Sequence, residues 1–187
     1  MLVRDYNGEG DWSVTAVQAR YRRYCAALGL DTPCALQPLT HSDARGTWIS
    51  PIMHPIIEGI ATGDPACAMI GVEFIEQDQS FPFGLILKSR TARALRRADL
   101  PETLQTRIRR RVAAMLAAGY TPREFKEYAR LLRKIGFDEQ WPAMAAAPPL
   151  GHAHAMRHYA YFRGVQERSP AFAAAARRAQ RSHRQAE

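Results

Sequence analysis

Residues 104–137 read LQTRIRRRVAAMLAAGYTPREFKEYARLLRKIGF and decide the fold class. Apolar side chains recur every three or four positions on both sides of Gly119. They are Leu104, Ile108, Val112, Met115 and Leu116 before it, and Phe125, Tyr128, Ala129, Leu132 and Ile135 after it. This spacing places each set on one face of an α-helix. The stretch therefore predicts two amphipathic helices that pack as an αα-hairpin.

The turn inside this hairpin carries the strongest local signal of the chain. Thr121 and Glu124 have the spacing of a capping box, in which the threonine hydroxyl and the glutamate carboxylate each bind a free backbone N–H. Pro122 would occupy the first helical position, where its missing N–H has no cost. The second helix is therefore predicted to begin at Pro122 and to end at Gly136.

The same spacing predicts further helices at about 13–28, 51–62, 66–77, 85–98 and 151–163, with another beginning at Ser169-Pro170. Ser50-Pro51 and Asp64-Pro65 are typical helix starts, with a capping side chain before a proline. Residues 1–11 are predicted to be a flexible lead, 31–48 a loop and 138–149 a linker. No segment of useful length alternates with period two, so no sheet is expected.

These elements predict an all-α helical bundle of about six to eight helices built from αα-hairpins. We expect a helical domain at 1–146 and a C-terminal helical extension with a basic tail at 147–187. Gly63 and Gly119 each lie in a turn that is followed by a proline. Two such hairpins side by side would resemble a short fragment of a HEAT-type α-solenoid in their packing.

Composition limits the class of protein. The chain has 187 residues, 47% of them hydrophobic, which is enough to form a core without a disulfide or a metal. Its three cysteines, Cys25, Cys34 and Cys67, form no C-x-x-C pair, which favours a reducing compartment. No secretory signal and no apolar run of about 20 residues is visible. We expect a cytoplasmic protein with no cofactor and no membrane partner.

The charge is divided unevenly along the chain. Residues 1–86 carry five arginines and ten acidic residues, whereas residues 87–187 carry 21 basic and eight acidic residues. The segment 88–134 alone holds 14 basic and four acidic residues. Such an imbalance indicates either an anionic partner or internal pairing between the two halves.

A basic helical face can neutralise the charges of an acidic protein surface or of a nucleic-acid backbone. The candidate anion-binding residues are Arg93, Arg96, Arg97, Arg107, Arg109, Arg110, Arg111, Lys126, Arg130 and Arg133. The sequence therefore predicts a small, non-enzymatic interaction module. A solvated surface without a partner remains the alternative for these side chains.

Other patterns point to different functions, and the alternative to an interaction module is a metal- or His/Glu-dependent enzyme that uses the histidines below. Residues 104–137 could form a helix-turn-helix, but both helices are too long and no separate recognition helix follows.

His54 and Glu58 are four residues apart, as a general acid–base pair could be. His152, His154 and His158 could share a metal ion, although no Cys or carboxylate lies nearby at ligand spacing. Tyr120, Phe125, Tyr128, Phe137 and Trp141 could stack on bases or belong to the core.

Overall fold

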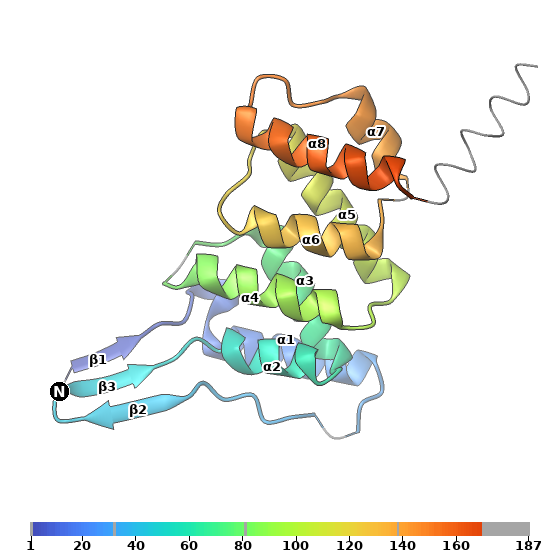
Figure 1. Cartoon of the computed structure of the whole chain (residues 1–187). Coiled ribbons are helices and arrows are strands. Elements are labelled where there is room, and N and C mark those ends of the chain that lie inside the picture. The colour runs from blue at the N-terminus through green and yellow to red at the C-terminus, as the bar shows by residue number, and fades with distance from the viewer. Residues whose placement is uncertain (1, 32, 81, 138, 170–187) are drawn as a thin grey trace, which may run out of the picture.

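Residues 2–31, 33–80, 82–137 and 139–169 are described by the computed structural model of the chain. Within them the protein is mostly helical, with a small sheet near the N-terminus (Figure 1). The helices are α1 (Val14–Ala27), α2 (Met53–Ala61), α3 (Pro65–Gln77), α4 (Gly84–Arg97), α5 (Glu102–Ala117), α6 (Phe125–Ile135), α7 (Gln140–Ala146) and α8 (Ala153–Glu167). The strands are β1 (Leu2–Asp5), β2 (Thr40–Asp43) and β3 (Gly46–Ile49), and a 3-10 turn at Gly10–Trp12 precedes α1. The prediction of a mainly helical protein is confirmed, but the prediction of a purely α-helical one is wrong.

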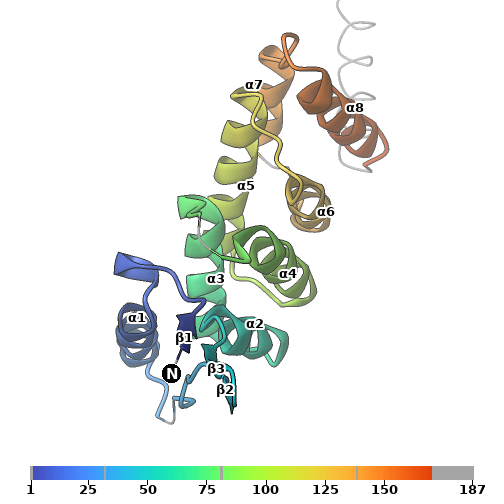
Figure 2. The same ribbon diagram turned by 90° about the vertical axis from the view of Figure 1, so that its left-hand side faces the viewer.

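The helices are arranged in two layers. In Figure 1, α2, α4, α6 and α8 lie one above another and form what we call the front layer, and Figure 2 shows α1, α3, α5 and α7 forming the rear layer. In the front layer α4 packs against α2 and α6, and α6 packs against α8. In the rear layer α3 packs against α1 and α5, and α5 packs against α7. Each helix thus contacts mainly its neighbours in the stack.

The sheet projects from the end of the stack formed by α1 and α2 (Figure 1). Its central strand, β3, is parallel to β1 and antiparallel to β2. The Asp43 carboxylate stabilises the β2–β3 turn by accepting a 2.7 Å hydrogen bond from the backbone N–H of Arg45. A Cβ at Gly46 would collide with the carbonyl oxygen of Leu2, so β1 can approach β3 only because residue 46 is a glycine.

The prediction of no sheet is therefore wrong, and so are the flexible lead predicted at 1–11, which contains β1, and the part of the loop predicted at 31–48 that forms β2 and most of β3. Every residue of β1 and of β2 is exposed to solvent. Neither strand has a buried face, so neither shows the alternation of polar and apolar residues that marks a half-buried strand. Each is also only four residues long, too short for a pattern to stand out.

The predicted helices agree with the structure apart from some of their starts, the end of α8 at Glu167 where 163 was predicted, and one omission. Asp64 caps α3 as expected, with Oδ1 accepting from the N–H of Ala66 at 2.8 Å and of Cys67 at 3.0 Å. Ser50 does not cap α2; its hydroxyl donates to the carbonyl oxygen of Leu39 at 2.9 Å, and the helix begins at Met53. The segment 138–149, predicted as a linker, contains the short helix α7.

The capping box predicted at Thr121–Glu124 does not form, because α6 begins at Phe125. The Glu124 side chain is buried, and its carboxylate lies 3.5 Å from the Nζ atom of Lys88. Charge pairing with a different helix therefore replaces the local cap. The αα-hairpin of α5 and α6 is nevertheless present, since the two helices pack against each other.

One hydrophobic core runs through the stack, from Trp12 near α1 to Phe162 in α8. The division of the chain at residue 146 stays a prediction. The helix predicted from Ser169-Pro170 and the basic tail extend beyond the described residues. No helix in the described part of the chain is long and apolar enough to cross a lipid bilayer.

Candidate anion-binding groove

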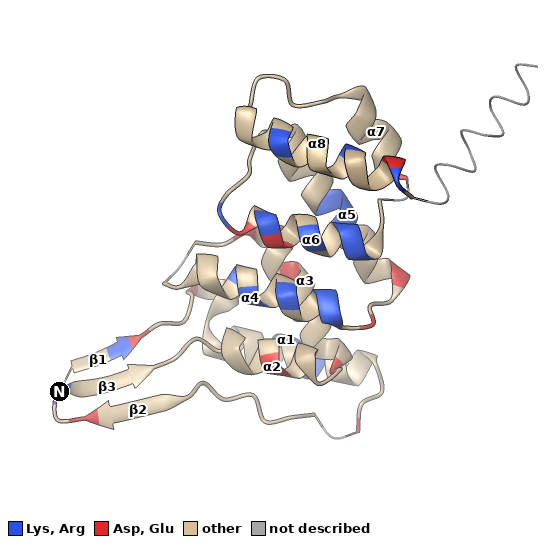
Figure 3. Cartoon of the chain, viewed as in Figure 1, with Lys and Arg blue, Asp and Glu red and all other residues tan. Residues whose placement is uncertain are grey.

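The solvent side of the front layer carries a large share of the positive charge. Figure 3 shows lysine and arginine positions in α4, α6 and α8, which lie one above another in the front layer. On α6, Lys126, Arg130 and Arg133 are separated by four and three residues, so they follow one another along one side of the helix at about one turn, or about 5.4 Å. The packing of α6 between α4 and α8 sets this row between two further helices.

An open groove of about 800 Å³, the basic groove, follows this row. It is lined by residues of α4, α6 and α8: Arg96, Lys126, Ala129, Arg130, Arg133, Lys134, His158 and Tyr161. Ala129 is buried, and its short side chain leaves space between the longer ones. None of these eight residues is acidic, so an anion in the groove would meet five cationic side chains.

A single buried carboxylate organises the arginines beside the groove. Glu127 is only 2% exposed, and its carboxylate pairs with Arg130 at 2.8 Å and with Arg93 and Arg96 at 3.5 Å. One negative charge therefore holds three guanidinium groups, and the cluster of these four side chains keeps a net positive charge. Holding long side chains in place reduces the entropy that they would lose on binding a ligand.

The remaining cations of the basic groove are not neutralised by any described part of the chain. Lys126, Arg133 and Lys134 have no carboxylate partner among the residues that the structure describes. Arg133 donates a hydrogen bond of 3.4 Å to the hydroxyl of Tyr161, an uncharged group on α8. These three side chains keep their full charge available to an anion.

The arginines of α5 are placed differently. Arg107 makes a double hydrogen bond to Glu76 on α3, with Nε 2.9 Å from Oε1, and this bond raises the pKa of the arginine. Arg111 pairs with Asp78 at 3.2 Å. The acidic N-terminal half thus neutralises part of the predicted surface. Arg110 and Arg97 are exposed but do not line the groove.

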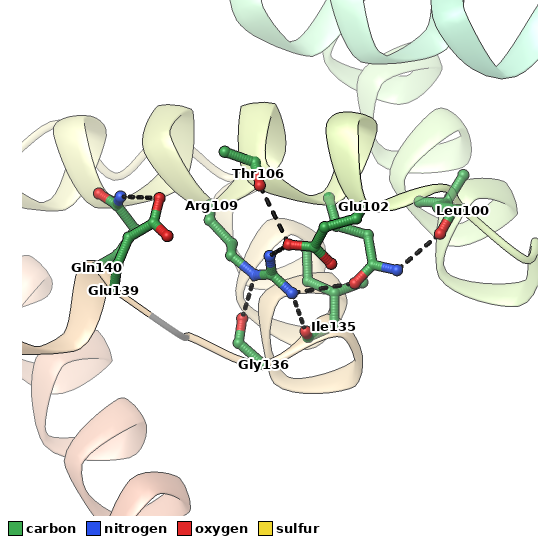
Figure 4. Close-up of polar contacts among 9 residues, drawn as sticks. Leu100, Glu102, Thr106, Arg109, Ile135, Gly136, Glu139 and Gln140 are labelled. Carbon is green, nitrogen blue, oxygen red and sulfur yellow. Dashed lines mark hydrogen bonds and ion pairs between the residues drawn. The ribbon is translucent and has the colours of Figure 1, made fainter.

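Arg109 is only 3% exposed, so we remove it from the candidate site. Figure 4 shows its guanidinium group against the C-terminal end of α6. It donates to the carbonyl oxygens of Ile135 at 2.7 Å and Gly136 at 3.2 Å, and also bonds Gln105 and Glu102. The bond from Arg109 lowers the pKa of Glu102. Arg109 therefore links α5 to α6 inside the molecule and does not face a partner.

The histidines of the alternative hypotheses do not form a common site. The Nδ1 atom of His54 lies 2.9 Å from an Arg90 nitrogen, and no hydrogen bond joins His54 to Glu58 among the described contacts. His152 and His154 line a shallow pocket beside Gly119, whereas His158 lines the basic groove. No three His, Cys, Asp or Glu side chains in the described ranges are arranged to hold a metal ion.

The His54 environment predicts a pH effect on stability. Burial lowers the pKa of His54 below its usual 6.5, and the positive charge of Arg90 lowers it further, against a smaller opposing effect of Glu58. The unfolded chain therefore binds a proton to His54 more readily than the folded protein does. The free energy of unfolding should fall as the pH drops below about 6.5, until the folded-state pKa is passed.

His54→Gln, which can still accept a bond from Arg90, should flatten the pH dependence of stability between about pH 7 and pH 5. Urea unfolding across this range measures the effect. His41→Gln, at an exposed position of β2, is the matched control and should follow the unmodified protein. Equal slopes for the His54 and His41 variants would contradict the prediction.

Most of the predicted stacking aromatics belong to the core. Phe125, Tyr128 and Phe137 are buried, and Trp141 stacks on Tyr159 with ring centroids 6.2 Å apart. Only Tyr120 is exposed. The aromatic residues of the groove, His158 and Tyr161, were not predicted, since nothing in the sequence of α8 shows which helix it packs against.

No family model, curated protein or solved structure matches the chain.

Proposed function

We propose that this protein is a non-enzymatic interaction module that binds an anionic partner through the basic groove. The observation that carries the proposal is the convergence of five cationic side chains, with no acidic one, on a single open groove. Clustered charge of one sign in a recess attracts and concentrates ligands of the opposite sign.

The distribution of ion pairs supports this choice of surface. Carboxylates of α3 and the residue that follows it neutralise Arg107 and Arg111 on α5. By contrast, Lys126, Arg133 and Lys134 on α6 have no such partner among the described residues. Because neutralised arginines contribute little to ligand binding, the free cations of α6 are the better candidates.

The arrangement of helices also fits a binding role. Two layers of helices with contacts mainly between neighbours are typical of α-solenoids, which use the face of one layer to bind extended partners. We therefore propose a HEAT-like packing in which the front layer provides the binding face. This fits a groove that crosses three successive helices of one layer.

A triple variant tests the proposal. Lys126→Ala/Arg133→Ala/Lys134→Ala should weaken binding to heparin and reduce the slope of log affinity against log salt by about two to three, since each lost ionic contact contributes about 0.7 to 0.9. Retention on immobilised heparin and titration at several salt concentrations measure both quantities.

The matched control is Arg4→Ala/Arg22→Ala/Arg23→Ala, which removes the same three charges from exposed positions in β1 and α1. It should leave the salt slope close to that of the unmodified protein. An equal loss in the two triple variants would show that heparin responds to net charge alone. Lack of heparin binding by the unmodified protein at low salt would remove the polyanion form of the proposal.

A further inference from the structure

We infer that the anionic partner is a single-stranded nucleic acid, whose phosphates contact the cations of the basic groove and whose bases stack on Tyr161 and His158. This inference rests on the proposed function and specifies the class of ligand. Single strands are commonly bound by a positively charged groove combined with aromatic side chains, because every base offers a flat face for stacking.

Two aromatic rings stand beside the cations of the groove. His158 and Tyr161 are three residues apart on α8, so they lie on the same side of that helix, and both line the groove. Tyr161 packs on Phe162 with centroids 5.7 Å apart, and its hydroxyl accepts a hydrogen bond from Arg133. The His158 ring meets that of Phe125 edge-on at 4.7 Å. Both rings are therefore held in place before any ligand arrives.

His158 is suited to stacking at neutral pH. Burial lowers the pKa of His158 below its usual 6.5, and the nearby His154 lowers it further. The ring is therefore uncharged at pH 7 and offers an aromatic surface next to the cations. Protonation is not needed for the groove to be positive, since its five lysines and arginines supply the charge.

The hydrogen-bonding character of the groove favours a phosphodiester backbone over a peptide. The lysine and arginine side chains that line it are donors only. The phosphate groups of a nucleic acid offer acceptors only, so the two sets are complementary. A bound peptide would bring a backbone N–H at almost every residue, and only the Tyr161 hydroxyl and the His158 ring could accept from it.

The rings favour a single strand over a duplex. In a duplex the faces of the bases are covered by the neighbouring base pairs, so an aromatic side chain on the outside cannot stack on them. In a single strand the bases are accessible and can be splayed onto a ring.

The experiment uses the full-length chain and a labelled oligothymidylate of about twelve nucleotides, a length in the range of single-strand binding sites. Fluorescence anisotropy at fixed salt compares this strand with an abasic strand of the same length, with a duplex and with poly-L-glutamate. We expect the oligothymidylate to bind about tenfold or more tightly than the abasic strand. The duplex and poly-L-glutamate should bind more weakly than the oligothymidylate.

Tyr161→Leu should weaken oligothymidylate binding about tenfold and should weaken abasic-strand and heparin binding much less, because it removes a ring and no charge. Tyr161→Phe keeps the ring and should retain most of the oligothymidylate affinity that Tyr161→Leu loses. Circular dichroism confirms that each variant is folded. The comparison with the abasic strand tests the contribution of base stacking with the unmodified protein, so it does not depend on the folding of any variant.

Equal affinity for the abasic strand and the oligothymidylate would overturn the inference, and so would tighter binding of the duplex. Tighter binding of poly-L-glutamate would overturn it in favour of an acidic protein partner. In each of these cases the polyanion proposal survives if heparin binding depends on Lys126, Arg133 and Lys134. Absence of binding to all of the polyanions, heparin included, would remove both.

Discussion

Replacing Lys88 with methionine should lower the free energy of unfolding by about 3–5 kcal/mol at neutral pH. Lys88 is only 4% exposed, and its ammonium group pairs with Asp78 and with Glu124. Glu124 is only 1% exposed, and neither of its carboxylate oxygens accepts a hydrogen bond among the described residues. Methionine fills the space of the lysine stem but leaves the buried Glu124 charge uncompensated. Asp78 keeps its second partner, Arg111.

Two further variants separate charge from packing. Lys126→Met makes the same replacement at an exposed position and should change stability by no more than about 0.5 kcal/mol. Lys88→Met/Glu124→Gln removes both members of the pair and should recover about 1–3 kcal/mol of the loss. Urea unfolding followed by circular dichroism measures all three. If Lys88→Met were as stable as Lys126→Met, the buried pair would not have the role that we assign to it.

Arg109→Ala should lower the free energy of unfolding by about 2–4 kcal/mol. The guanidinium group donates to the carbonyl oxygens of Ile135 and Gly136, at the end of α6, where a helix has no donors of its own. Alanine would leave these acceptors without their donor and would open space between α5 and α6. The loss should appear as a lower denaturation midpoint with little change in secondary structure.

The neighbouring arginine provides the control. Arg110→Ala removes an exposed side chain from the same helix and should cost at most about 0.5 kcal/mol. Arg109→Lys keeps the charge but not the planar fork that reaches two carbonyl groups, so it should be intermediate. If the Arg109→Ala protein had the same denaturation midpoint as the Arg110→Ala protein, the α5–α6 connection would not depend on the Arg109 side chain.

Much of the helical fold could be predicted from the sequence because helix periodicity is a local property. All but one of the apolar residues of 104–137 that predicted the hairpin, such as Ile108 and Leu132, are buried in the core, and Ile135 is partly buried against it. The strands could not be predicted in this way, since β1 and β2 have no buried face. Glu124 shows the limit of a local motif, because its charge pairs with Lys88 on another helix and not with the backbone nearby.

The candidate site could be predicted only in part. The sequence placed Lys126, Arg130 and Arg133 among the candidate anion-binding residues of a basic helical region, and these residues line the groove. Which arginines of α5 are neutralised depends on residues far away in the chain, as the pairing of Arg107 with Glu76 shows. The position of Tyr161 beside α6 depends on tertiary packing, which no local pattern reveals.

Because each helix stacks on its neighbours, the binding of a ligand in the groove would affect the local stability of α8. α8 is the last helix of the stack that the structure describes and packs mainly against α5 and α6, so its opening would leave most contacts among the other described helices intact. A ligand held between α6 and α8 would bind only the docked arrangement and would therefore suppress the local opening of α8. By the same linkage, a substitution that loosens α8 far from the ligand would weaken affinity without removing any contact to it.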